Sequence, residues 1–176
     1  MIAGYKKELL IPQQLIDKRI KEIADQITED YKGKELILIG ILKGAIFFLA
    51  DLARQLSLPV KIDFIRVSSY GSRMEPGKLT LTKDVEIPIQ GKPVLIVEDI
   101  IDTGHTLNYV KRLLLDKGAE SVKICVLIDK TERREKEIDI DYCAFKVEKG
   151  FLIGYGLDYN EEGRCLPEIY ILQGQE

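Results

Sequence analysis

The chain of 176 residues has little cysteine, almost no histidine and no excess of basic residues. Its three cysteines, Cys125, Cys143 and Cys165, are an odd number without metal-ligand spacing, which argues against a disulfide framework and indicates reduced thiols. His105 is the only histidine, so it has no histidine partner for a metal site. Because the formal net charge is -3, no basic field favours nucleic acid as the main partner.

Long apolar runs are also missing from the sequence. The most apolar region, residues 36–50, is too short to span a bilayer and contains Lys43. The N-terminus lacks the apolar stretch and cleavage signature of a signal peptide. We therefore expect a soluble, cytoplasmic protein with no membrane partner. With 45% hydrophobic residues, the length suits a single globular domain over residues 1–176.

Apolar patterning predicts an alternation of strands and helices. The run at residues 94–97, V-L-I-V, suits a strand buried on both faces, as in a parallel sheet. The alternation predicts the α/β class, with a twisted, mostly parallel sheet covered by helices on both faces. Helices are expected at residues 12–31, 45–56 and 107–115, and strands at 35–41, 60–67, 94–97, 121–128, 142–145, 151–155 and 168–172.

The most informative segment is residues 94–107, V-L-I-V-E-D-I-I-D-T-G-H-T-L. Glu98 and Asp99 follow its strand, and open α/β sheets bind ligands at the carboxyl ends of their strands. The next turn opens a helix, whose free N–H groups bind phosphate, and Gly104 allows close approach to a ligand. Carboxylates also suit sugar hydroxyls and Mg²⁺, so the segment predicts a joint site for sugar, phosphate and metal. In the plainer alternative, Glu98 and Asp99 are solvated and Asp102 only caps the helix.

The pattern E-D-I-I-D-T-G-x-T after an aliphatic strand resembles the phosphoribosyl pyrophosphate motif of the type I phosphoribosyltransferases, in the form of their hypoxanthine (hypoxanthine-guanine) branch. The resemblance implies the type I fold with a small hood from terminal segments, Mg²⁺ as cofactor, and transfer of a phosphoribosyl group to N9 of hypoxanthine or guanine. It makes Asp102 the catalytic proton acceptor. It implies ribose-phosphate binding by Glu98, Asp99, Asp102, Thr103, Gly104, His105 and Thr106, and metal binding by Glu98, Asp99 and Asp158.

The turn L-K-G at residues 42–44 resembles the pyrophosphate loop of the same branch. The resemblance implies pyrophosphate binding by Lys43, Gly44 and Arg164, and a cis peptide bond between Leu42 and Lys43. From the residues alone, Lys43 is equally well explained as a surface lysine whose stem packs on apolar neighbours.

The resemblance also reaches the purine site and a catalytic lid. Lys130 donates hydrogen bonds but accepts none, so it suits the 6-oxygen of hypoxanthine or guanine and not the 6-amino group of adenine. The plainer alternatives place Lys130 in the solvated charged segment K-T-E-R-R-E-K-E at residues 130–137, Phe151 in the core, and the lid in an ordinary hairpin. By resemblance, purine is bound by Lys130, Phe151, Leu152 and Asp158, and the lid contains Ser69 and Tyr70.

Two other functions stay open from the sequence. A related enzyme that prefers xanthine would use Lys130 in the same way. A regulator that senses phosphoribosyl pyrophosphate would keep the fold, but it usually needs a basic surface or an added domain, which the acidity and length disfavour. The resemblance implies a homodimer or homotetramer.

Overall fold

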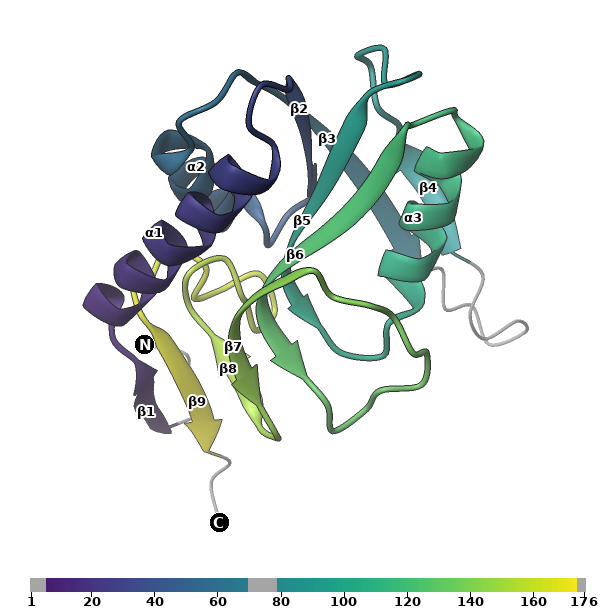
Figure 1. The fold of residues 1–176 in the computed structure, drawn as a ribbon. Coiled ribbons are helices and arrows are strands. Elements are labelled where there is room, and N and C mark those ends of the chain that lie inside the picture. The colour runs from purple at the N-terminus through teal and green to yellow at the C-terminus, as the bar shows by residue number, and fades with distance from the viewer. Residues whose placement is uncertain (1–5, 70–78, 174–176) are drawn as a thin grey trace.

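The computed structural model describes residues 6–69 and 79–173 of the chain (Figure 1). The elements follow one another as β1 (Lys6–Ile11), α1 (Gln13–Asp30), β2 (Leu36–Ile41), α2 (Ile46–Gln55), β3 (Val60–Ser69), β4 (Leu79–Lys83), β5 (Pro93–Ile101), α3 (His105–Asp116), β6 (Ser121–Lys130), β7 (Tyr142–Val147), β8 (Phe151–Ile153) and β9 (Ile169–Gln173). The three predicted helices are thus confirmed, with α3 starting two residues before the expected position. No helix in the described ranges is long and apolar enough to cross a membrane.

Six strands form the central sheet in the order β4-β3-β2-β5-β6-β7. The neighbours from β3 to β7 pair in parallel, and β4 runs antiparallel to β3. This confirms the predicted α/β fold with a mostly parallel sheet. From β2 the chain proceeds to β3 on one side, and from β5 it proceeds to β6 and β7 on the other. Parallel sheets bind ligands at such a switch point, so the carboxyl ends of β2 and β5 are the expected location of a site.

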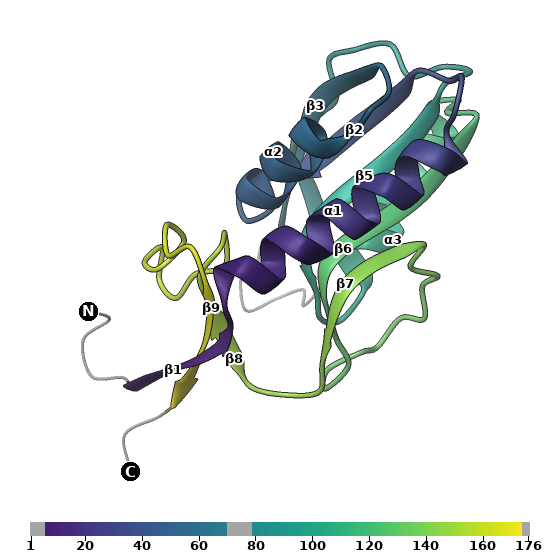
Figure 2. The same ribbon diagram turned by 60° about the vertical axis from the view of Figure 1, so that its left-hand side comes forward.

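The apolar strands β2, β5 and β6 have side chains on both faces of the sheet because both faces are covered. Leu36 and Leu38 of β2 pack in one cluster with apolar residues of α1 and α2. Ile37 and Ile39 point to the other face, in a cluster with the buried side chains of α3. Figure 2 shows α1 and α2 on one side of the sheet and α3 on the other. The helices thereby hold the strand ends of β2 and β5 in fixed positions.

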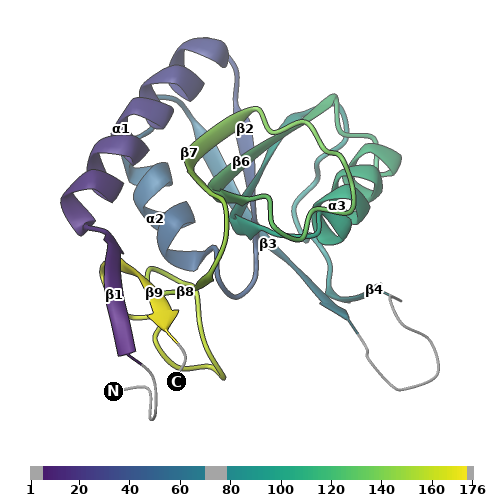
Figure 3. The same cartoon turned by 90° about the horizontal axis from the view of Figure 1, so that it is seen from below.

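A second, three-stranded antiparallel sheet has the order β1-β9-β8. It joins both ends of the described chain, since Lys6 of β1 lies opposite Gln173 of β9. Figure 3 shows this small layer at one end of the molecule. It is the hood that the resemblance implied. Strand β1 was not predicted, because five of its six residues are exposed and give no buried face to detect.

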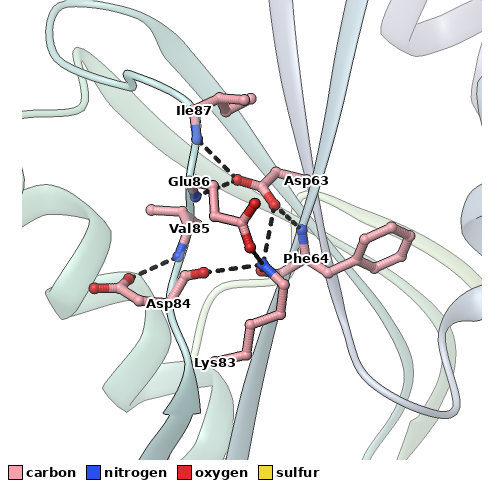
Figure 4. Close-up of polar contacts among 7 residues, drawn as sticks. All are labelled: Asp63, Phe64, Lys83, Asp84, Val85, Glu86 and Ile87. Carbon is pink, nitrogen blue, oxygen red and sulfur yellow. Dashed lines mark hydrogen bonds and ion pairs between the residues drawn. The ribbon is translucent and has the colours of Figure 1, made fainter.

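Strand β4 was also missed, and a buried carboxylate fixes the chain that follows it (Figure 4). The Asp63 side chain is 7% exposed. It accepts hydrogen bonds from the backbone N–H groups of Phe64, Glu86 and Ile87 at 2.7, 2.5 and 3.0 Å. The ammonium of Lys83 lies 3.3 Å away. Burial acts to raise the pKa of Asp63, but these donors outweigh it and hold the pKa below its usual value.

Candidate active site

The end of β5 carries two adjacent carboxylates. Glu98 is 7% exposed and Asp99 is half-buried. Burial raises the pKa of Glu98 well above its usual value, and the negative charge of Asp99 adds to the shift. Burial also raises the pKa of Asp99, although the nearby guanidinium of Arg164 acts in the opposite direction. Two adjacent carboxylates, one buried and one half-buried, favour a cation or a hydrogen-bond donor beside them.

After β5, residues 102–104 lead into the first turn of α3, and we call residues 102–106 the phosphate loop. Gly104 has a φ of 88°, in the left-handed region, and is the last residue before the helix. Glu98, Asp102, Thr103 and Thr106 line a cavity of about 130 Å³ there. The free N–H groups at a helix start make such a cavity a natural anion site. His105, by contrast, turns its imidazole to Glu135, with Nε2 at 2.8 Å from Oε2.

The loop after β2 comes against the end of β5, as the switch point requires. The Leu42–Lys43 peptide bond is cis, as the resemblance implied. A Cβ atom on Gly44 would lie 1.7 Å from Oδ2 of Asp99. A Cβ on Gly156 would lie 2.0 Å from the carbonyl oxygen of Gly44. Gly44 therefore packs against the side chain of Asp99, and Gly156 packs against the backbone of Gly44, with no space for a larger residue at either glycine.

Three residues predicted to bind pyrophosphate or metal lie in one group of ion pairs: Lys43, Asp158 and Arg164. Arg164 donates to the carbonyl oxygen of Gly156 at 2.7 Å and pairs with Asp158 at 2.8 Å. Lys43 pairs with Glu161 at 2.9 Å, and Arg164 also lies 3.4 Å from the same carboxylate. The Glu161 carboxylate thus pairs with both Lys43 and Arg164, and it was not predicted from the sequence. Its only sequence signal is its place between Asp158 and Arg164.

A second cavity, of about 200 Å³, lies beside the phosphate loop. Phe151 is 50% exposed there, so it is not the core residue of the plainer alternative, and its ring meets Tyr159 edge-on with centroids 5.4 Å apart. Lys130 is 8% exposed, and its ammonium lies 3.3 Å from Glu132. The cavity is lined by Asp99, Ile100, Asp102, Lys130, Arg133, Gly150, Phe151, Leu152, Leu157 and Asp158. It thus contains all four predicted purine residues.

Asp102 lines both cavities. Its Oδ1 atom is buried and has no hydrogen-bond partner among the described residues, while Oδ2 lies 3.5 Å from Nη1 of Arg133. The structure therefore places one carboxylate between the phosphate loop and the cavity beside it, with one oxygen unpartnered among the described residues. Arg133 was not predicted, because it stands in a run of mixed charge.

Two predictions have a different outcome. Ser69 ends β3, but Tyr70 lies outside the described residues, so the lid stays a prediction. The charged segment at residues 130–137 is not simply a solvated surface. Its first residue, Lys130, is buried, and the carbonyl oxygen of Thr103 accepts the N–H groups of Glu135 and Lys136 at 3.1 and 3.0 Å. Sequence reasoning missed this because a mixed run of charge gives no sign of backbone contacts.

Comparison with known proteins agrees with this fold. The family model described as the phosphoribosyl transferase domain matches residues 8–160. The "Hypoxanthine-guanine phosphoribosyltransferase" of Aquifex aeolicus is 43% identical over 98% of both chains. The protein of that name from Streptococcus pneumoniae is 44% identical, over 98% of this chain and 97% of its own. A crystal structure of a hypoxanthine-guanine phosphoribosyltransferase from Bacillus anthracis has a TM-score of 0.90 and 38% identity, covering 96% of this chain and 99% of that one. The chain belongs to the phosphoribosyltransferase family.

Proposed function

We propose that this enzyme is a hypoxanthine-guanine phosphoribosyltransferase of purine salvage. It transfers the 5-phosphoribosyl group of phosphoribosyl pyrophosphate to N9 of a 6-oxopurine, and the products are IMP or GMP and pyrophosphate. Relatives with that name match nearly the whole chain. The observation that carries the proposal is that Asp102 lines two adjoining cavities, one at a helix start and one beside Lys130 and Phe151.

The phosphate loop is assigned to the ribose phosphate. The N–H groups at the start of α3 and the hydroxyls of Thr103 and Thr106 would bind the 5-phosphate. Glu98 and Asp99 would accept hydrogen bonds from the ribose hydroxyls. The backbone of His105 fits the same loop, whereas its imidazole faces Glu135 and contributes no contact to the ligand in this assignment.

Pyrophosphate is assigned to Lys43, Gly44 and Arg164. Lys43 and Arg164 already pair with the carboxylate of Glu161, so an incoming pyrophosphate would replace that carboxylate as their anionic partner. The fork of Arg164 is held by Gly156 and Asp158, which fixes its direction before the ligand arrives. Loss of pyrophosphate leaves positive charge at the ribose carbon, as in glycoside cleavage.

The carboxylates at this end of the sheet suit Mg²⁺. Among the residues described, no group of three or more acidic, histidine or cysteine side chains is arranged to hold a metal alone. Mg²⁺ instead commonly uses one or two carboxylates together with substrate phosphates, and Glu98 and Asp99 offer such ligands, with Asp158 lining the same cavity as Asp99. When bound, Mg²⁺ would neutralise and orient the pyrophosphate leaving group.

The purine is assigned to the cavity of about 200 Å³. The exposed ring of Phe151 offers a face for stacking, and Leu152 and Asp158 would meet the polar edge through their backbones. Lys130 would donate to the 6-oxygen. Asp102 would accept the proton from the purine imidazole ring through its unpartnered Oδ1, as the general base.

The proposal is tested by incubating the purified protein with Mg²⁺, phosphoribosyl pyrophosphate and one base at a time. We expect nucleotide and pyrophosphate with hypoxanthine and guanine and no turnover with adenine. Preference for xanthine would replace the assignment by the related xanthine enzyme. Binding of phosphoribosyl pyrophosphate without turnover of any base would support the regulator instead.

We further propose that the chain acts in the cytoplasm as one domain and as a homodimer or homotetramer. Large apolar side chains exposed on β1 and α2 support association, and they include Leu9, Leu10, Ile46 and Phe47. Sedimentation of the purified protein tests the assembly, and a monomer at all concentrations would contradict it.

A further inference from the structure

A single guanidinium joins the ends of β5 and β6. Arg134 has a side chain only 19% exposed, although it stands in a highly charged segment. Its Nε donates to the carbonyl oxygen of Asp102 at 2.9 Å, and its Nη2 donates to that of Lys130 at 3.2 Å. Nη2 also pairs with Asp129 at 2.5 Å and lies 3.4 Å from the carbonyl oxygen of Ile101. The one side chain thus contacts the backbone of the proposed base and of the proposed purine reader.

These contacts begin where the pairing of β5 with β6 ends. Pairing of β5 with β6 stops at Ile101 and Asp129. Asp102 and Lys130 lie one residue farther along and do not form a pair in the register of β5 and β6, although Lys130 still pairs with Val147 of β7. Arg134 connects the two residues through their carbonyl oxygens, because a planar guanidinium has five donors in a fixed arrangement.

The backbone next to Arg134 reinforces the connection. Residues 131–137, which we call the strap, cross the phosphate loop, where the carbonyl oxygen of Thr103 accepts two strap N–H groups. Glu135 of the strap also pairs with His105. A Cβ on Gly104 would lie 2.7 Å from the carbonyl oxygen of Lys136, so the glycine is needed for the strap as well as for its positive φ.

We propose that Arg134 is a positioning residue for phosphoribosyl transfer. It holds the backbone of Asp102 at a fixed distance from Lys130, so that the general base faces the purine that Lys130 orients. The charge of the buried Asp129 keeps the guanidinium in place, since both partners are largely removed from water. This inference rests on the proposed function, but the connection itself is open to a separate measurement.

The test compares Arg134→Lys and Arg134→Met with Arg112→Lys, an exposed arginine of α3. Lysine keeps the positive charge beside Asp129 but lacks the fork that reaches the carbonyl oxygens. Methionine also removes the charge and leaves the Asp129 carboxylate buried and unpaired, which threatens folding. Each variant is checked for folding by thermal unfolding, then measured for kcat and for KM of both substrates.

Misplacing a catalytic group by about 1 Å lowers the rate by up to about 100-fold. We therefore expect Arg134→Lys to be folded, with kcat about 10- to 100-fold lower and a raised KM for hypoxanthine, while KM for phosphoribosyl pyrophosphate changes less. Arg112→Lys should match the wild type. Wild-type kinetic constants in folded Arg134→Lys would overturn the inference, because a residue that only stabilises the fold has no effect once the protein is folded.

Amide hydrogen exchange gives a readout without turnover. In Arg134→Lys, the amides of residues 101–106 should exchange at least about tenfold faster than in the wild type, with little change in α1. Unchanged exchange in this loop would overturn the connection. If the wild type does not turn over hypoxanthine or guanine, the proposed function fails, and the exchange result still decides whether Arg134 fixes the loop.

Discussion

Replacement of Gly44 by alanine tests the packing of the loop after β2 against Asp99 of β5. The new Cβ would lie 1.7 Å from Oδ2 and 2.5 Å from Cγ of Asp99. Ordinary contact needs roughly 3.5 Å, so the carboxylate or the loop must move by about 1.8 Å. The Asp99 side chain also accepts the N–H of Ile100 at 2.8 Å, and that hydrogen bond would be strained or lost.

A displacement of this size is large enough to be measured in two ways. Overpacking lowers the free energy of unfolding by about 1–3 kcal/mol. Misplacement of a substrate-binding group by more than about 1 Å lowers kcat/KM by about 100-fold, equivalent to about 2.7 kcal/mol in the transition state. We expect both effects in Gly44→Ala, measured by urea unfolding and by turnover of phosphoribosyl pyrophosphate with hypoxanthine.

Gly33→Ala provides the control. Gly33 has a φ of 77° and no atom within 4 Å of the added Cβ, so alanine there introduces backbone strain of about 1–2 kcal/mol without a collision. Its activity should equal that of the wild type. The reasoning is refuted if Gly44→Ala keeps kcat/KM within threefold of the wild type, because Asp99 would then not need its present position.

Three further substitutions test separate parts of the argument. Asp102→Asn should lower kcat about 100- to 10,000-fold in a folded protein, because the amide cannot take the proton, and full activity would remove Asp102 from catalysis. Phe151→Ala should raise KM for hypoxanthine about 5- to 100-fold with little change in unfolding, since the ring is 50% exposed; an unchanged KM would argue against stacking. Asp63→Asn should lower the free energy of unfolding by about 1–3 kcal/mol at pH 7. Because the pKa of Asp63 is lowered in the folded state, its stabilisation is present above the unfolded pKa of about 3.9 and is lost as pH falls through the folded value. Urea unfolding of Asp63→Asn and the wild type is therefore compared at pH 7 and at a pH below the folded pKa of Asp63. The difference in free energy of unfolding should be smaller at the lower pH, and an equal difference at both would contradict this linkage.

The parts of the fold that sequence reasoning found were those with a one-dimensional signal. The apolar runs of β2, β5 and β6 are buried on both faces, so they read as continuous hydrophobic stretches. The apolar face of α1 recurs at Ile16, Ile20, Ile23 and Ile27, all of them buried. By contrast, β1 depends on pairing with β9, more than 150 residues away, and its exposed residues carry no periodic pattern.

The same distinction separates the site residues that were predicted from those that were missed. The E-D-I-I-D-T-G-H-T segment indicated a phosphate and carboxylate site because strand, turn and helix are adjacent in the chain. Glu161 and Arg133 were missed because their partners, Lys43 and Asp102, are distant in sequence. The strap was interpreted as a solvated segment for a related reason, since charge alone does not reveal the buried backbone acceptors that Arg134 meets.

By itself the sequence determined the alternation of strands and helices and the family, and it predicted a phosphate site at residues 94–107, because each depends on residues close together in the chain. Tertiary structure decided which groups face one another. The switch between β2 and β5 brings Gly44 to Asp99, and the strap brings Arg134 to both strand ends. Such contacts follow from the packing of the helices on both faces of the sheet, which fixes where each strand ends in space.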